Sequence, residues 1–275
     1  MNDLRVTVSK SARAIFLCLC AMFASAQLFA DNATPDARKI IEAVDAQQSA
    51  ASSISMKATF QVFDKDGQSA KKDFVYRHTS APSDSRTLAI FTAPKEIRGV
   101  ALLSIQQSGA AERQYVYTPA TDRVRSVVTQ ERSARFIGTD FSFEDIGEHS
   151  LGDFTYQLLG SAETIDGHKV YKVAATPVDS SHSQYKYIYQ WVAQDVPVIL
   201  YSEFYNAQGK LIRVLHATGL KRENGIWGAR HTEMRTVPDG TRTVLTIDEV
   251  KFNIKSDEKL FTPEGLSAAS ASATK

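Results

Sequence analysis

Four residues between positions 140 and 149 carry side chains that could act as acids, bases or metal ligands. They are Asp140, Glu144, Asp145 and His149. A pair of carboxylates could do acid–base chemistry, but on a helix only residues three or four apart share a face, so Glu144 and Asp145 are predicted to point in different directions. The chain has no H-E-x-x-H pattern, and its six histidines are scattered singly. We therefore expect no metal, no cofactor and no enzyme activity, and keep a hydrolase that uses these carboxylates as a lesser alternative.

Aromatic side chains recur at every second position in two segments. The residues are Tyr185, Tyr187, Tyr189 and Trp191 in one segment, and Tyr115 and Tyr117 in the other. Because successive side chains of a strand point to opposite faces, each set is predicted to lie on one face of one strand. Two interpretations stay open, a packed or exposed sheet face and a binding surface.

The first thirty residues are predicted to be a secretory signal peptide. Arg5, Lys10 and Arg13 precede an uncharged apolar run over residues 14–23, and small residues suitable for cleavage follow. The run is far shorter than the roughly 20 residues that span a bilayer. Both cysteines, Cys18 and Cys20, lie inside this segment, so the mature chain is expected to lack disulfides. We expect a periplasmic protein.

Residues 31–266 are predicted to form a single domain, followed by a disordered tail over residues 267–275. The tail is small and polar in composition. The whole chain has 32 Lys and Arg against 31 Asp and Glu, which gives no support for nucleic-acid binding. A helix is expected over residues 34–49, with Thr34 as N-cap, Pro35 in the first turn and one apolar face.

After this helix the apolar residues alternate, which indicates strands. The first strand has an apolar face made of Ile54, Met56, Ala58, Phe60 and Val62. Turn dipeptides such as Asp66-Gly67 recur along the chain and separate about eleven candidate strands. The fold class is thus mainly β with few helices (α+β), a large curled antiparallel sheet or open barrel. One or two helices cannot cover such a sheet, so a concave apolar surface should remain for a hydrophobic ligand.

Residues 129–151 interrupt the strand pattern. The segment holds five large apolar residues, Phe136, Ile137, Phe141, Phe143 and Ile146, and a short helix is expected at Ser142–Ile146 with Thr139 or Asp140 as N-cap. Long connections of this kind are often functional lids. A plug that closes one end of the sheet is the alternative, and both stay open.

Several segments resemble the outer-membrane lipoprotein-sorting protein family of LolA-like periplasmic carriers. The most distinctive is the run from Phe136 to Ile146, FIGTDFSFEDI, and others are Gly99–Leu103, Tyr115–Pro119 and Arg123–Arg125. The resemblance is to the broader branch rather than to the lipoprotein carrier itself. It implies a half-open antiparallel β-barrel covered by a helical lid, LolA/LolB-like, with acyl chains bound between sheet and lid.

Together these observations predict a monomeric carrier of lipid or lipoprotein acyl chains, or of another hydrophobic molecule, that contacts membranes transiently. An inner-membrane transporter is the expected partner, and a non-enzymatic adaptor of such a complex, without lipid cargo of its own, is the alternative. The residues expected to line the hydrophobic cavity and lid are Ile54, Met56, Phe60, Leu102, Tyr115, Tyr117, Phe136, Ile137, Phe141, Phe143 and Ile146.

Overall fold

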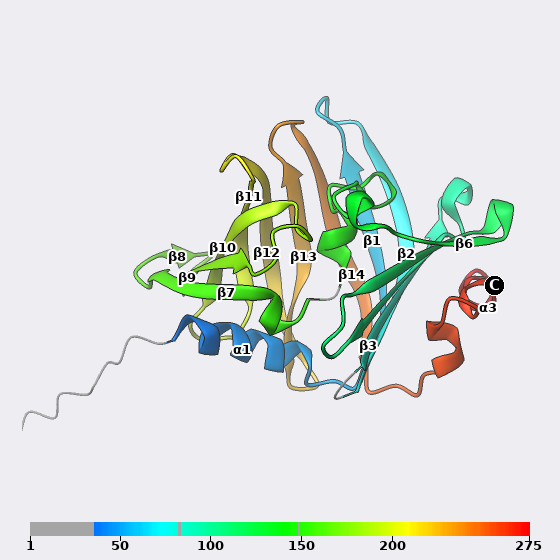
Figure 1. The fold of residues 1–275 in the computed structure, drawn as a ribbon, viewed down its shortest axis with the longest axis horizontal. Helices are drawn as coiled ribbons and strands as arrows, with labels where there is room; N and C mark the ends of the chain where they lie inside the picture. Colours follow the sequence, from blue (N-terminus) through cyan, green and yellow to red (C-terminus); the bar gives the residue numbers. More distant parts are fainter. Residues whose placement is uncertain (1–35, 82–83, 148) are drawn as a thin grey trace, which may run out of the picture. The chain divides into compact units, whose positions relative to one another are not determined.

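A computed structural model describes residues 36–81, 84–147 and 149–275 (Figure 1). The chain divides into two units, Met1–Thr34 and Pro35–Lys275. The predicted signal peptide lies outside the described residues and stays a prediction. Within the described ranges, no helix combines the length and the apolar character that a membrane crossing requires.

The second unit is built on one antiparallel sheet with fourteen strands in the described residues. The first six are β1 (Ser53–Phe63), β2 (Ser69–Ala81), β3 (Asp84–Ala93), β4 (Ala101–Gln107), β5 (Arg113–Thr118) and β6 (Arg123–Ser126). The others are β7 (Phe154–Gly160), β8 (Thr164–Ile165), β9 (His168–Pro177), β10 (Tyr185–Ala193), β11 (Ile199–Asn206), β12 (Leu211–Glu223), β13 (Ile226–Thr236) and β14 (Thr241–Phe252). The predicted count of eleven was too low. β8 has two residues, and all four residues of β6 are exposed, so neither shows an alternating apolar pattern.

The first and last strands pair in the middle of the sheet. The strand order is β6-β5-β4-β3-β2-β1-β14-β13-β12-β11-β10-β9-β7, and β8 pairs with β9. The β1–β14 ladder runs from Ile54 opposite Phe252 to Phe63 opposite Arg242. The chain therefore runs from the centre to the β6 edge, crosses to the β7 edge and returns to the centre. The sheet is curled but not closed, because its two edge strands do not pair with each other.

The long connection between the two edge strands lies over the concave side of the sheet (Figure 1). Its regular pieces are η3 (Thr129–Glu131), η4 (Phe136–Gly138), α2 (Phe143–Ile146) and η5 (Leu151–Asp153). The connection is long because it must span the open sheet from edge to edge. It is mostly loop and 3₁₀ turns with one α-helical turn, so the predicted helical lid is not confirmed.

The helix expected within this connection is present, with a different N-cap from either predicted residue. The Ser142 hydroxyl accepts a hydrogen bond of 3.2 Å from the Asp145 backbone N–H, and the Asp145 carboxylate accepts one of 2.7 Å from the Ser142 N–H. This reciprocal capping box satisfies two backbone donors at once. Thr139 and Asp140 lie upstream of the cap.

Helix α1 (Ala37–Gln48) lies against the concave side near β7 (Figure 1). Its N-cap is Asp36, whose side chain accepts from the Arg38 N–H; Thr34 and Pro35 lie outside the described residues. The predicted apolar face is confirmed. Ile40, Ile41 and Val44 are buried and share a cluster with Val173 and Val192 of the sheet.

The end of the chain is helical, which corrects the prediction of a disordered tail. Helix α3 (Leu266–Ala273) follows η6 (Glu258–Phe261). Phe261, Leu266 and Ala269 are buried in a cluster with alternate residues of β3 and β4, such as Leu88 and Leu103. Small residues allow α3 to pack closely on the sheet, so the composition that indicated disorder serves a tight contact instead.

The main core lies on the concave side and is a chain of aromatic rings. Ring centroids of Phe60 and Phe74 are 4.6 Å apart, those of Phe60 and Phe141 are 5.5 Å apart, and those of Phe91 and Phe136 are 5.5 Å apart. Phe136 and Phe141 come from the connection, and both are buried among strand residues. In this structure the connection fills one end of the curled sheet.

A candidate hydrophobic binding cavity

A cavity of about 1360 Å³ remains on the concave side of the sheet. Its wall comes from β1, β2, β12, β13 and β14, and its cover comes from α1 and the connection. Apolar wall residues include Ile54, Met56 and Phe60 of β1 and Leu245 and Val250 of β14. The period-two pattern of β1 thus places three predicted residues in the cavity wall, because alternate side chains share the concave face.

The two ends of the cavity differ. Phe136, Phe141 and Ile146 of the connection line one end. At the opposite end of the same strands, the β12–β13 hairpin contributes Trp227 and the charged residues below.

The charged residues of this hairpin form one ion-paired group. The Lys221 ammonium lies 2.8 Å from Oε1 of Glu223, and the Arg230 guanidinium contacts the same oxygen. The hydrogen bond from Lys221, with that from Arg230, lowers the pKa of the Glu223 carboxyl. This end of the cavity is charged, whereas apolar side chains such as Met56, Phe60 and Phe141 line much of the wall and the opposite end.

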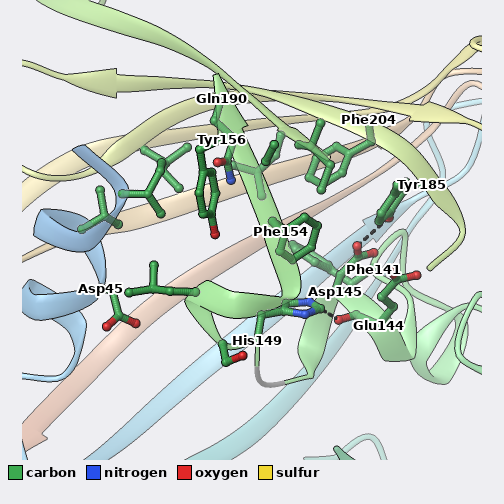
Figure 2. Close-up of a pocket in the computed structure, with 18 of the residues that line it drawn as sticks. Asp45, Phe141, Glu144, Asp145, His149, Phe154, Tyr156, Tyr185, Gln190 and Phe204 are labelled. Carbon is green, nitrogen blue, oxygen red and sulfur yellow. Dashed lines mark hydrogen bonds between the residues drawn. The ribbon is translucent and has the colours of Figure 1, made fainter. Parts of the chain in front are cut away.

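A smaller recess of about 240 Å³ adjoins the cavity beneath α1 and β7 (Figure 2). Asp45, His149, Tyr156 and Gln190 line it together with apolar residues. Burial, together with Asp153 and Asp45, raises the pKa of Tyr156 to about 12, although Arg38 acts in the opposite sense. The phenol therefore keeps its proton and can donate a hydrogen bond.

The three acidic residues Asp140, Glu144 and Asp145 are hydrogen-bonded within the fold. Asp140 is fully buried and accepts hydrogen bonds of 2.6 Å from Thr236 and 2.7 Å from Thr243, and another from Thr241. Arg135 lies 3.4 Å away. Asp140 thereby holds the connection against the β13–β14 hairpin.

Glu144 and Asp145 point to different partners, as the helical spacing predicts. Glu144 accepts hydrogen bonds of 2.5 Å from Ser183 and 3.0 Å from the Gln184 N–H. Asp145 accepts one of 2.5 Å from Tyr185 and lies 2.8 Å from Arg213 (Figure 2). Glu144 thus fixes the connection to the segment that leads into β10, and Asp145 fixes it to β10 and β12.

Asp145, Tyr185 and Arg213 form a buried network. The Arg213 guanidinium donates to the Tyr185 oxygen at 2.6 Å as well as to Asp145. Burial raises the pKa of the Tyr185 phenol well above its usual value, and the Asp145 charge acts in the same sense. Burial alone would lower the pKa of Arg213, but Tyr185 and Asp145 raise it overall. Arg213 therefore stays charged and Tyr185 protonated.

Five of the predicted binding residues do not line the cavity. Leu102 and Phe143 are buried in the concave core, and Ile137 packs against it. Tyr115 and Tyr117 pack in the separate cluster around α3, and Tyr117 donates to Asp122 at 3.0 Å. Residues of β4 and β5 alternate between these two clusters, and the sequence does not tell which cluster lies on the concave side of the sheet.

The row of four aromatic residues on β10 is broken by a register shift. Tyr185 joins the concave core, with its ring 4.9 Å from Phe204. Tyr187 instead stacks 4.7 Å from Tyr205 and lies 5.0 Å from Tyr189. The ladder between β10 and β11 shifts between Tyr185 and Tyr187, which reverses the side that alternate residues face. A bulge of this kind leaves no mark in the period-two pattern.

Gln190 and Ser202 line the cavity but were not among the predicted residues. A signal for Gln190 was present in the sequence, since it lies between Ile188 and Val192 on one face of β10. A polar residue in an apolar row is informative because burying it without a partner is unfavourable.

Comparisons with known proteins agree with the fold. A family model described as that of an uncharacterized protein matches residues 83–268. Among solved structures, a domain from Vibrio parahaemolyticus assigned to outer membrane lipoprotein sorting has a TM-score of 0.77 and 22% identity, covering 84% of this chain and all of its own. A DUF1329 family protein from Desulfovibrio piger has a TM-score of 0.79 and 21% identity, with 85% and 100% coverage. A LolA superfamily protein from Nitrosomonas europaea has a TM-score of 0.65 and 22% identity, with 83% and 98% coverage. No curated protein matches the chain.

Proposed function

The chain belongs to the family whose model matches residues 83–268, in the broader LolA-like branch. On that premise we propose that it is a periplasmic carrier of lipid or lipoprotein acyl chains. The cavity on the concave side carries the proposal. At about 1360 Å³ it exceeds the roughly 300–1,000 Å³ typical of small-molecule sites. Its wall is rich in aliphatic and aromatic side chains, so long hydrocarbon chains suit it better than compact polar metabolites do.

Transfer of a hydrocarbon chain into this cavity provides the driving force. Each buried methylene contributes about 0.8 kcal/mol, so ten of them contribute roughly 8 kcal/mol before the entropy of association is subtracted. The surplus that remains is compatible with reversible binding, which a shuttle between two membranes requires. Transient membrane contact and delivery by an inner-membrane transporter belong to the same proposal.

Native mass spectrometry of protein purified from its own cell envelope tests the carrier function. We expect wild type to retain lipid adducts, and Met56→Asp to lose them, because Met56 lines the cavity wall. Val178→Asp is the matched control, since Val178 is 64% exposed. Circular dichroism and thermal unfolding verify that both variants are folded. Repeated recovery of wild type without any lipid would contradict the proposal.

An adaptor function is the second candidate, and the cluster of Tyr187, Tyr189 and Tyr205 favours it. The three rings lie within 5.3 Å of one another and are partly exposed. Tyrosine combines a large apolar ring with a polar tip, which suits protein interfaces. Affinity purification with the Tyr187→Ala/Tyr189→Ala double variant tests this candidate. Loss of a membrane transporter from the purified complex in this variant, with wild type recovered free of lipid, would support the adaptor.

A further inference from the structure

Gln190 occupies a polar position in an otherwise apolar row of the concave wall. Its neighbours on the same face of β10, Ile188 and Val192, are 7% and 1% exposed. Gln190 lines both the cavity and the recess, so it lies where the two spaces meet (Figure 2). A leucine or valine at this position would complete the row, and the glutamine therefore needs another explanation.

The side-chain oxygen of Gln190 is buried and has no hydrogen-bond partner among the residues that the structure describes. Buried amide oxygens are nearly always paired, because an unpaired acceptor loses its water without compensation. Rotation of the terminal amide of Gln190 would turn this oxygen towards the space that the residue lines, where a donor on a ligand would pair with it.

Ser202 lies directly opposite Gln190 on the neighbouring strand. The two residues are partners in the β10–β11 ladder, and Ser202 is 3% exposed yet lines the cavity. Side chains of directly opposed residues in antiparallel strands lie side by side on one face. A second polar group therefore adjoins the Gln190 amide within the apolar wall.

We propose that Gln190 and Ser202 form a hydrogen-bonding site for an apolar ligand that carries a hydroxyl or amide N–H donor. The inference rests on the proposed carrier function and specifies the ligand class. The site accepts a donor at the junction of recess and cavity, while the hydrocarbon of the ligand occupies the apolar space.

The chemistry of the site favours a neutral donor over an ion. The Gln190 amide and the Ser202 hydroxyl are neutral, so neither supplies the opposite charge that an ionised ligand group would need. Two of the carboxylates that line the recess already have partners, because Glu144 accepts from the Gln184 N–H and Asp145 is ion-paired with Arg213. A hydroxyl or an amide N–H needs one acceptor, and a hydroxylated lipid and an N-acyl amide both carry such a donor.

Competition binding tests this proposal with three probes of equal chain length. The probes are dodecanol, dodecyl methyl ether, which lacks a donor, and dodecanamide, and each displaces a fluorescent fatty-acid analogue. We expect wild type to prefer dodecanol to the ether, and Gln190→Leu to reduce that preference up to roughly tenfold, the effect of one neutral hydrogen bond. Ser202→Ala should reduce it by a smaller factor.

Gln157→Leu on β7, where Gln157 is exposed, controls for the added apolar side chain. If folded Gln190→Leu still binds both probes and the ratio of its affinities for dodecanol and the ether equals that of wild type, the hydrogen-bonding site is overturned. The carrier function would then still stand. Failure of wild type to bind any probe or the fluorescent analogue overturns the carrier function itself. A larger effect on dodecanamide than on dodecanol identifies the N-acyl amide as the source of the donor.

Discussion

Removal of both charges from the Asp145–Arg213 pair should destabilise the protein by less than the sum of the two single removals. Their atoms lie 2.8 Å apart, and the side chains are 6% and 7% exposed, respectively. Asp145→Leu would leave the Arg213 charge buried with the Tyr185 hydroxyl as its remaining polar partner. An uncompensated buried charge of this kind costs about 3–5 kcal/mol of unfolding free energy. For a domain of this size, that loss corresponds to a fall in Tm of about 6–20 °C.

The matching single variant is Arg213→Met, and the double variant replaces the pair with apolar side chains of similar size. Apolar replacement of a whole buried pair is often neutral or stabilising. We therefore expect the double variant to lose less stability than the sum of the two single losses, measured by urea unfolding followed by circular dichroism. Recovery stays incomplete, because Asp145 also accepts from the Tyr185 hydroxyl and from the Ser142 N–H. Additive losses in the double variant would refute this account of the pair. Asp145→Asn should also leave lipid binding intact, and loss of a hydrolytic activity in that variant would instead favour the enzyme alternative.

Three further predictions concern Phe141 of the connection, the contact of Gly99 with α3, and the stability in acid. Phe141→Asp should abolish lipid binding and lower stability, because Phe141 is 5% exposed and lines the cavity; binding that survives a loss of stability would make the ring a core element alone. Gly99→Ala should lower unfolding free energy by about 1–3 kcal/mol in urea titrations, since φ is +83° and a Cβ would lie 2.7 Å from the Ser270 hydroxyl; unchanged stability would contradict this. A hydrogen bond from Ser181 lowers the pKa of Asp179 to about 2. Its stabilisation should therefore be complete above about pH 4 and disappear as the pH falls towards 2, and Asp179→Asn should weaken this acid dependence.

Patterns that are local and regular predicted the fold well. The alternation along β1 identified the cavity-facing residues Ile54, Met56 and Phe60, because a strand offers only two faces and the apolar one turns inward. The loss of alternation after Thr129 marked the connection correctly. That segment must cross from one sheet edge to the other, which no strand can do.

Features that depend on partners distant in the sequence could not be predicted. Tyr115 and Tyr117 alternate as cleanly as the β1 residues, but their side of the sheet faces α3. Tyr185 left its row because of a bulge, which is a property of the ladder with β11. The buried partner of Asp145 is Arg213, a residue whose own neighbourhood in the sequence gives no sign of that contact.

The ladder between β1 and β14 has a consequence for how the protein folds. Ile54 pairs with Phe252, so the hydrogen bonds at the centre of the sheet join the beginning of the domain to its end. During synthesis β1 has a free edge until nearly the whole domain has emerged, and contacts of such high sequence separation form slowly. An exposed strand edge beside apolar surface is a site of aggregation. In the nascent chain, β1 is therefore the strand whose free edge needs protection from aggregation for the longest time, although it later lies in the middle of the sheet.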